Sequence, residues 1–287
     1  MEVLISLGLP LALAAIMVSL GIGLEVADFR RVSGRGPAFL LAVLAQILLL
    51  PALAFPLLYA LSAPPDLAAG ILLAALCPAG VAGPFLTRLA GGDVALAISL
   101  TVLTSLCAIL TIPLLSVWLL PLLMGTAAPR ISGSSIAISM FLLTSLPVAL
   151  GVTIRQYFRG AALRLDPALS RLSILLAAII IGTALIENAA TLTGARPQTL
   201  LLLIGMPALP FALGWGMGRL LQLPAGQARA LTLVLGTQNG ALGVTLAGVI
   251  VGLTQGFSSL ALPSALYGIT MFAVALPYVW ICRGRPA

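Results

Sequence analysis

The stretch from Ala230 to Cys282 contains no charged residue, and this constrains the fold more than any other feature of the chain. Similar apolar stretches recur along the sequence, and about 20 such residues cross the hydrocarbon core of a bilayer as a helix. Charged residues make up only 7% of the chain and mean hydropathy is +1.21, whereas soluble domains carry roughly a quarter charged residues. The alternating polarity of membrane β-barrels is absent. The sequence therefore predicts an all-α polytopic membrane protein.

The apolar stretches predict nine transmembrane helices joined by short connections. Their approximate residues are 3–26, 37–61, 66–90, 93–124, 135–158, 171–189, 198–221, 227–254 and 259–281. No connection or tail is long enough for a soluble domain. Residues 1–287 are therefore expected to form a single transmembrane domain.

All 14 basic residues are arginines, and their distribution over the connections predicts the orientation. Arg130 and Arg196 lie on one side of the predicted membrane. The opposite side holds Arg30, Arg31, Arg35, Arg88, Arg155, Arg159, Arg164, Arg171, Arg219, Arg229, Arg283 and Arg285. Cytoplasmic loops carry the excess of basic residues, so the C-terminus is expected in the cytoplasm and the N-terminus outside. The Ala-, Leu- and Arg-rich composition without Lys suggests a bacterial inner membrane, and arginines scattered over short loops argue against a nucleic-acid partner.

Two segments of the chain resemble each other. Residues 64–81 and 224–241 both begin with Pro at a helix entry, continue with about a dozen mostly apolar residues, and then break at a Gly-containing polar or Pro cluster. Upstream of them, PALAF at 51–55 matches PALPF at 207–211. The sequence thus indicates an internal repeat.

The repeat has opposite directions in its two copies, because Pro64 follows an outer connection and Pro224 an inner one. We expect repeat one at about 3–124, a linking span at about 135–158, and repeat two at about 171–281. Inverted repeats whose broken helices meet near the membrane midplane are a design of secondary transporters.

The two breaks carry the residues that membrane helices normally avoid. The first is CPAGVAGP, at 77–84, in which each Pro lacks an N–H and disturbs the preceding turn. The second is GTQNG, at 236–240, whose polar side chains can bond freed backbone groups. Unwound backbone exposes carbonyls that hold cations and helix N-termini that favour anions. The alternative is that these residues only tie neighbouring helices together.

The order and spacing of five motifs resemble the bile acid:sodium symporter family, in which two broken helices cross beside the ion and substrate sites. The resemblance covers nearly the whole chain. The motifs are LGIGLEVADFRR (20–31), AQILLLP (45–51), LCPAGVAG (76–83), RLAGGDVALAISLT (88–101) and GTQNGALG (236–243).

This resemblance implies the residues of two sodium sites. Gln46 and Gln238 match side-chain ligands of one site, which backbone carbonyls around Val234, Leu235 and Thr237 complete. Thr101 matches a hydroxyl ligand of the other site. Gln46 has a second interpretation, a hydrogen bond to a neighbouring helix.

The resemblance also places the substrate at the helix breaks. An anion would lie beside the half-helix N-termini at Gly83, Pro84, Asn239 and Gly240, with Thr104 on the adjoining span. For Thr101 and Thr104 the alternative is a hydrogen bond to their own helix.

Several family ligands are replaced in this chain. The family's Ser-Asn pair is Gly83-Pro84, a further Ser is Ala97, and the Glu shared by both sodium sites is Val234. We therefore expect one sodium site to be absent and the other, built from neutral oxygens, to bind weakly. A proton relay is disfavoured because the chain has no His and no acidic residue in the middle of a predicted span.

These features favour a secondary transporter for a small organic anion, either a sterol-like acid such as a bile acid or a keto acid. It would work by alternating access, with spans 1, 5 and 6 moving against spans 2–4 and 7–9. Transport is coupled to one sodium ion or, alternatively, is sodium-independent uniport. A non-transporting binder or sensor with the same fold is the rival hypothesis. No catalytic set of residues and no organic cofactor are predicted.

Overall fold

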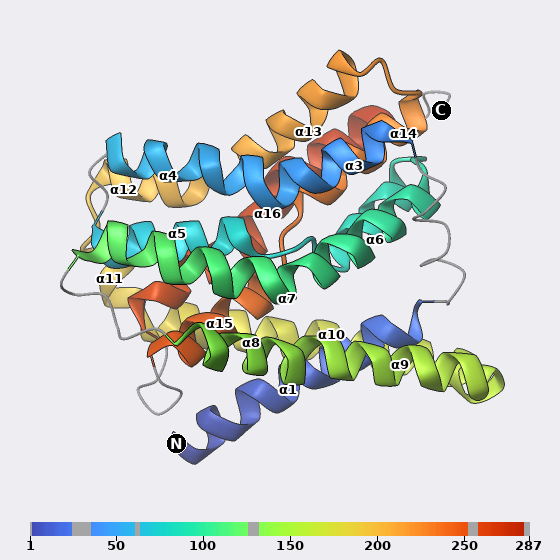
Figure 1. Ribbon diagram of the computed structural model, residues 1–287, viewed down its shortest axis with the longest axis horizontal. Coiled ribbons are helices and arrows are strands. Elements are labelled where there is room, and N and C mark those ends of the chain that lie inside the picture. Colours follow the sequence, from blue (N-terminus) through green and yellow to red (C-terminus); the bar gives the residue numbers. More distant parts are fainter. Residues whose placement is uncertain (1, 25–35, 61–63, 126–131, 252–257, 284–287) are drawn as a thin grey trace.

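The computed structural model describes residues 2–24, 36–60, 64–125, 132–251 and 258–283, and within these ranges the regular elements are all helical (Figure 1). The first part of the chain forms α1 (Glu2–Ile22), α3 (Pro37–Leu44), η1 (Ala45–Leu49), α4 (Leu50–Ala60), α5 (Pro65–Leu76), α6 (Ala82–Leu89) and α7 (Val94–Met124). The middle forms α8 (Gly133–Met140), η3 (Phe141–Ser145), α9 (Leu146–Tyr157), α10 (Arg159–Glu187) and α11 (Ala189–Thr193). The last part forms α12 (Pro197–Gly205), α13 (Ala208–Leu220), α14 (Ala225–Gly236), α15 (Gly240–Val251), η5 (Ser259–Ala261) and α16 (Leu262–Cys282).

The all-helical membrane class predicted from the sequence is confirmed. In the described part of the chain, five helical stretches are long and apolar enough to cross a bilayer: Ala38–Tyr59, Val94–Met124, Gly133–Tyr157, Arg159–Glu187 and Ser259–Cys282. A sixth is obtained when α12 and α13, which meet at a 41° bend, are counted as one span. Shorter apolar helices cover Pro10–Ile22, Pro65–Leu76 and Gly240–Val251.

One predicted connection is wrong. The sequence RGAALRLDPALSR, from Arg159 to Arg171, was expected to be a loop, but α10 begins at Arg159, directly after Phe158. Ala, Leu and Arg are strong helix formers, and they continue the helix through Asp166 and Pro167. The predicted loop residues from Asp28 to Arg31, together with Arg35, Arg130 and Arg285, lie outside the described residues.

The helices form two groups (Figure 1). The panel consists of α1, α8, η3, α9 and α10, in which α1 makes its most extensive contacts with α9 and α10. The core consists of α3 to α7 and α12 to α16, with α14 packed against α13, α6 and α7. The division of the nine predicted spans into spans 1, 5 and 6 against spans 2–4 and 7–9 stays a prediction.

Glycines allow the panel helices to approach closely. A Cβ atom built on Gly151 of α9 would overlap the carbonyl oxygen of Val18 and lie 2.8 Å from the Cα of Gly21 in α1. A Cβ on Gly21 would overlap the Val148 carbonyl in turn. Helices in lipid associate through such close packing because the surrounding acyl chains are as apolar as the side chains.

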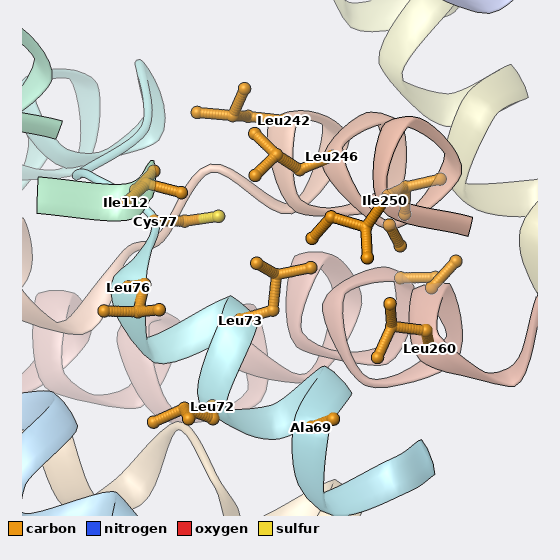
Figure 2. Close-up of a cluster of buried hydrophobic side chains, with 14 of the residues drawn as sticks. Ala69, Leu72, Leu73, Leu76, Cys77, Ile112, Leu242, Leu246, Ile250 and Leu260 are labelled. Carbon is orange, nitrogen blue, oxygen red and sulfur yellow. The ribbon is translucent and has the colours of Figure 1, made fainter. Parts of the chain in front are cut away.

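An apolar cluster fills the space between α5, α15 and the panel. Figure 2 shows Leu73 of α5 pointing toward Leu246 and Ile250 of α15. The same cluster contains Leu13 of α1 and Ile136 of α8, and these two line a gap of only about 10 Å³ together with Leu246. Panel and core are therefore closely packed along this seam, which we call the closed seam.

Two spans contain a widened, π-helical turn, and each has a Pro two residues after it. The turn η1 ends at Leu49 and is followed by Pro51, while η3 ends at Ser145 and is followed by Pro147. A Pro inside a helix removes one hydrogen bond and collides with the carbonyl four residues earlier, and a π-turn relieves that collision by opening the helix. Such turns occur frequently at functional sites.

Candidate functional site

The two helix breaks meet in the centre of the core. Residues 77–81 separate α5 from α6, and residues 237–239 separate α14 from α15. The Gly80 N–H donates to the Thr237 carbonyl at 2.8 Å, and the Asn239 N–H donates to the Pro78 carbonyl at 3.0 Å. Ala79 and Gln238 thereby form an isolated antiparallel bridge. The breaks thus satisfy part of each other's backbone, as a membrane interior requires.

Side chains from other spans bond the carbonyls that the breaks release. Gln46 Nε2 donates to the Cys77 carbonyl at 3.2 Å, and the Tyr267 hydroxyl donates to the Gly236 carbonyl at 2.8 Å. Sequence reasoning missed Tyr267, which lies on the last span and is 3% exposed. Nothing in its local sequence distinguishes it from an ordinary buried aromatic residue.

Gln46 and Gln238 form an amide cluster beside the crossing. Gln46 Nε2 donates to Gln238 Oε1 at 2.8 Å, and Gln238 Nε2 donates to the Leu235 carbonyl at 3.2 Å. Both side chains are 2% exposed. Gln46 Oε1 is buried and has no hydrogen-bond partner in the protein. An unpaired buried amide oxygen is costly, and it is also a ligand type that hard cations accept.

The predicted sodium ligands separate into two places. Gln46, Gln238 and Leu235 are joined by hydrogen bonds, and Val234 and Thr237 flank them on the same break. The Thr237 hydroxyl donates to the Leu233 carbonyl at 2.7 Å. The Thr237 carbonyl accepts the Gly80 N–H.

Thr101 is not part of the amide cluster. Its hydroxyl bonds to the Ala97 carbonyl at 2.9 Å, and Thr104 bonds likewise to Leu100 at 2.8 Å. Both side chains therefore follow the alternative interpretation, a bond to their own helix, in this structure.

A cavity of about 300 Å³, which we call the crossover pocket, lies between the panel and the breaks. Pro78, Thr101, Ser105 and Asn239 line its core side. Thr144, Ser145 and Thr153 line its panel side, together with apolar residues of α1 and α9. No charged side chain lines this pocket.

Of the predicted substrate residues, only Asn239 lines the crossover pocket. Its Oδ1 accepts the Leu242 N–H at 3.1 Å and so caps α15. Gly240 packs on α16, where a Cβ would lie 2.7 Å from the Ser264 carbonyl. Thr104 is 1% exposed and bonded to its own helix.

Gly83 and Pro84, the other two predicted substrate residues, lie at the start of α6. A Cβ on Gly83 would lie 2.9 Å from the Thr237 hydroxyl and 3.3 Å from the Val234 Cα. The chain at Gly83 is therefore in direct contact with the end of α14, and neither residue lines the crossover pocket.

A second cavity, of about 430 Å³, lies on another side of the amide cluster and is almost entirely apolar. Leucine, isoleucine and alanine residues of α4, α5 and α12 form most of its wall, and Gln238 and Tyr267 reach it. Gln238 therefore borders this apolar cavity as well as the crossing.

Arg229 was expected in a cytoplasmic loop, but this expectation is wrong. The residue lies within α14 and its side chain is only 6% exposed. Its Nη1 donates to the carbonyls of Ala90 and Gly91, each at 3.2 Å, at the end of α6. Gly91 has φ +66°, which favours glycine and turns the chain there. The guanidinium thus joins α6 and α14, one half of each broken helix.

Replacing Arg229 with Met is expected to lower the free energy of unfolding by about 1–3 kcal/mol, because two buried carbonyls lose their donor. Thermal denaturation of the purified protein measures this. Arg219→Met is the control, since the Arg219 guanidinium lies 5.0 Å from the Trp215 ring centroid on the exposed surface of α13 and contributes about 0.5–1 kcal/mol. Equal losses in both variants would contradict a helix-joining role for Arg229.

Comparison with known proteins identifies the family to which this chain belongs. The sequence profile of the Sodium Bile acid symporter family matches residues 10–195. The chain belongs to that family.

Relatives of this symporter family extend the match beyond residue 195. The sodium-dependent transporter YocS of Bacillus subtilis is 28% identical over 258 residues, which are 90% of this chain and 77% of that protein. The probable sodium/metabolite cotransporter BASS2 of rice chloroplasts is 29% identical, over 96% of this chain and 64% of its own length. The human sodium/bile acid cotransporter 4 is 30% identical over 79% of this chain and 52% of its own length. The chain thus spans well under two thirds of the human relative and just under two thirds of the rice one.

The symporter family places the two breaks and the pockets within a membrane transporter rather than an enzyme. Within the described residues, no three His, Cys, Asp or Glu side chains come together.

Proposed function

We propose that this protein is a secondary transporter that binds one sodium ion at the amide cluster and carries a small organic anion through the crossover pocket. The observation that carries the sodium assignment is the buried, unpartnered Oε1 of Gln46 beside Gln238 and the Leu235 carbonyl. A sodium ion would replace the Gln46–Gln238 hydrogen bond, so that both amide oxygens and the carbonyls of Val234, Leu235 and Thr237 face the ion. Affinity would be weak, because no carboxylate offsets the dehydration of the ion.

The proposal includes only this one sodium site. At the position of the other, Gly83 touches α14 directly, and a Cβ there would be 3.4 Å from the Val234 side chain. Val234 is 1% exposed and apolar. Thr101 alone supplies no ligand set, because the other positions that the family resemblance assigns to this site hold Gly83, Pro84, Ala97 and Val234, whose side chains carry no oxygen.

The topology proposed is nine spans in two inverted repeats, 3–124 and 171–281, in one domain of the bacterial inner membrane. Three paired irregularities support it: the breaks at 77–81 and 237–239, the mutual backbone bonds between them, and the disturbed turns before Pro51 and at Met206–Pro207. The PALAF and PALPF segments begin at these two disturbed turns.

With the N-terminus outside, the crossover pocket lies in the cytoplasmic half of the protein. Leu24 lies two residues after the end of α1 and Thr153 lies near the end of span 5, and both line this pocket. The closed seam then lies toward the outside. The structure described here is thus proposed to be the inward-facing state of an alternating-access cycle.

A small carboxylic acid is the substrate class that the crossover pocket supports best. Its volume of about 300 Å³ is at the lower limit of ordinary ligand pockets, which favours a keto acid or a similar small acid over a sterol-like acid. The lining offers hydroxyls and one amide, and α15 begins at Gly240 with its positive dipole end at the break. These features favour one negative charge without a cationic partner.

The sodium assignment is tested by thermal stability in NaCl against KCl at equal ionic strength. The wild type is expected to be stabilised selectively by sodium, by about 1–2 kcal/mol at tens of Kd, which is a few degrees in Tm. Gln46→Ala and Gln238→Ala are expected to lose this difference. Gln198→Ala, an exposed amide at the start of α12, is expected to keep it. Identical curves for the wild type in both salts would favour sodium-independent uniport, or a non-transporting sensor if proteoliposomes show no uptake.

A further inference from the structure

The π-turn η3 contains Ser145, a residue that lines the crossover pocket and whose hydroxyl has an unusual environment. Serine and threonine side chains in membrane helices usually bond the carbonyl four residues earlier, as Thr144 does with Met140 at 2.5 Å and Thr153 with Ala149 at 2.7 Å. Ser145 Oγ is buried and makes no hydrogen bond in the protein. It thus lacks the partner that its neighbours have.

The widened turn explains why Ser145 differs. The Phe141 carbonyl, four residues before Ser145, accepts the N–H of Leu146 in the π-turn. Pro147 follows and opens the turn further, because it has no N–H of its own to complete the ladder. In this turn the Ser145 hydroxyl makes no bond to the Phe141 carbonyl.

The position of Ser145 separates it from other unpaired serines. Within the described chain, the hydroxyls of Ser116, Ser258 and Ser264 are also buried without a partner. Of this group, only Ser145 lines one of the two large cavities. Asn239 lines the same cavity from the core side; its Oδ1 accepts the Leu242 N–H, and its Nδ2–H is the group that can donate to an anion.

We propose that Ser145 donates a hydrogen bond to the transported anion from the panel, and that it selects acids carrying a second oxygen next to the carboxylate. This inference rests on the proposed function of the crossover pocket. The carboxylate would lie on the core side, at Asn239 and the start of α15. The second oxygen would accept a hydrogen bond from the Ser145 hydroxyl. An acid with only its carboxylate gains no hydrogen bond from Ser145, whereas an acid with the second oxygen does and therefore binds more tightly.

The contact also connects the substrate to both moving groups. Asn239 belongs to the core and Ser145 to the panel. A substrate bonded to both holds panel and core together while the pocket closes, whereas an acid bonded only to the core does not. Ser145 is therefore a specificity-determining residue on the panel side.

Three acids with the same four-carbon skeleton test the proposal: butyrate, 2-oxobutyrate and 2-hydroxybutyrate. Thermal stability of the purified full chain is titrated with each acid at constant NaCl. For the wild type, the two oxygenated acids are expected to reach half of their effect at about three- to tenfold lower concentration than butyrate, the contribution of one hydrogen bond. Ser145→Ala is expected to remove this preference, and Ser145→Thr to retain it.

Ser116→Ala is the matched control, since this hydroxyl is buried and unpartnered in α7 but lies outside both large cavities. It should keep the wild-type preference. A Ser145→Ala protein that still prefers the oxygenated acids overturns the role of Ser145. A wild type that responds equally to all three acids, or to none, overturns the selectivity. Sodium stabilisation, measured in the same samples without acid, reports separately on the proposed ion site, so the two proposals can fail independently.

Discussion

Linking Ile136→Cys to Leu246→Cys is expected to reduce uptake into proteoliposomes to about a tenth or less, and reduction of the link is expected to restore it. Ile136 lies on the panel and Leu246 on the core, and both line the small gap of the closed seam. Alternating access requires one repeat or bundle to move relative to the other, so outward opening separates these side chains. A covalent link prevents that separation and holds the protein in the proposed inward-facing state.

The link is made with a short bis-methanethiosulfonate and verified by mass spectrometry. Cys107, which is partly exposed, is first replaced with Ser, while Cys77 and Cys282 are buried. The control pair is Leu13→Cys with Ile136→Cys, because both residues line the same gap but belong to the panel. Linking the control pair should leave uptake intact. Full uptake by the linked Ile136–Leu246 protein would show that the seam does not open during transport.

Gly151→Val is expected to give the largest loss of stability of any single substitution considered. Its side chain would overlap the Val18 carbonyl and the Gly21 backbone, which are rigid parts of α1. Overpacking typically costs about 1–3 kcal/mol, and more when backbone cannot move. Since α1 packs chiefly on α9 and α10, the displaced helix would also widen the panel side of the crossover pocket.

Thermal denaturation and uptake both report on this change. Gly182→Val is the matched control, because Gly182 also lies inside a membrane helix but a Cβ there meets nothing within 4 Å. The control is expected to change Tm little, whereas Gly151→Val should lower it by about 5 °C or more. Comparable Tm values for the two variants would mean that α1 can move away from α9 without loss.

Sequence reasoning identified the helical membrane class and the two helix breaks because long apolar runs and Pro–Gly clusters are local signals. The amide cluster was also predictable, but only through the family motifs, since Gln46 and Gln238 are 192 positions apart and no local pattern pairs them. The hydroxyl of Ser145 could not be singled out. A serine in an apolar helix is indistinguishable from its back-bonded neighbours until the π-turn before Pro147 is known.

Charge was the least reliable guide to local structure. Arg229 follows the entry Pro224 by five positions and has the sequence context of a loop cation, yet the end of α6 requires its donors. Arg159 and Arg164 made the start of α10 resemble a loop, although helix propensity favours a continuous helix there. For Arg229 the contact with α6 outweighed the expected exposure of an arginine, and for Arg159 and Arg164 the helix propensity of the segment outweighed the expected loop.

The helix crossing is joined by two hydrogen bonds between main-chain atoms, from Gly80 to Thr237 and from Asn239 to Pro78. Main-chain bonds do not depend on which side chains stand at the neighbouring positions, provided that close approach is preserved. Side chains near the crossing, such as the buried Val234, can therefore be exchanged without removing these two bonds, provided that the new side chain fits. A substitution at Val234 could thus be used to change the proposed ion coupling while the two main-chain bonds of the crossing stay in place.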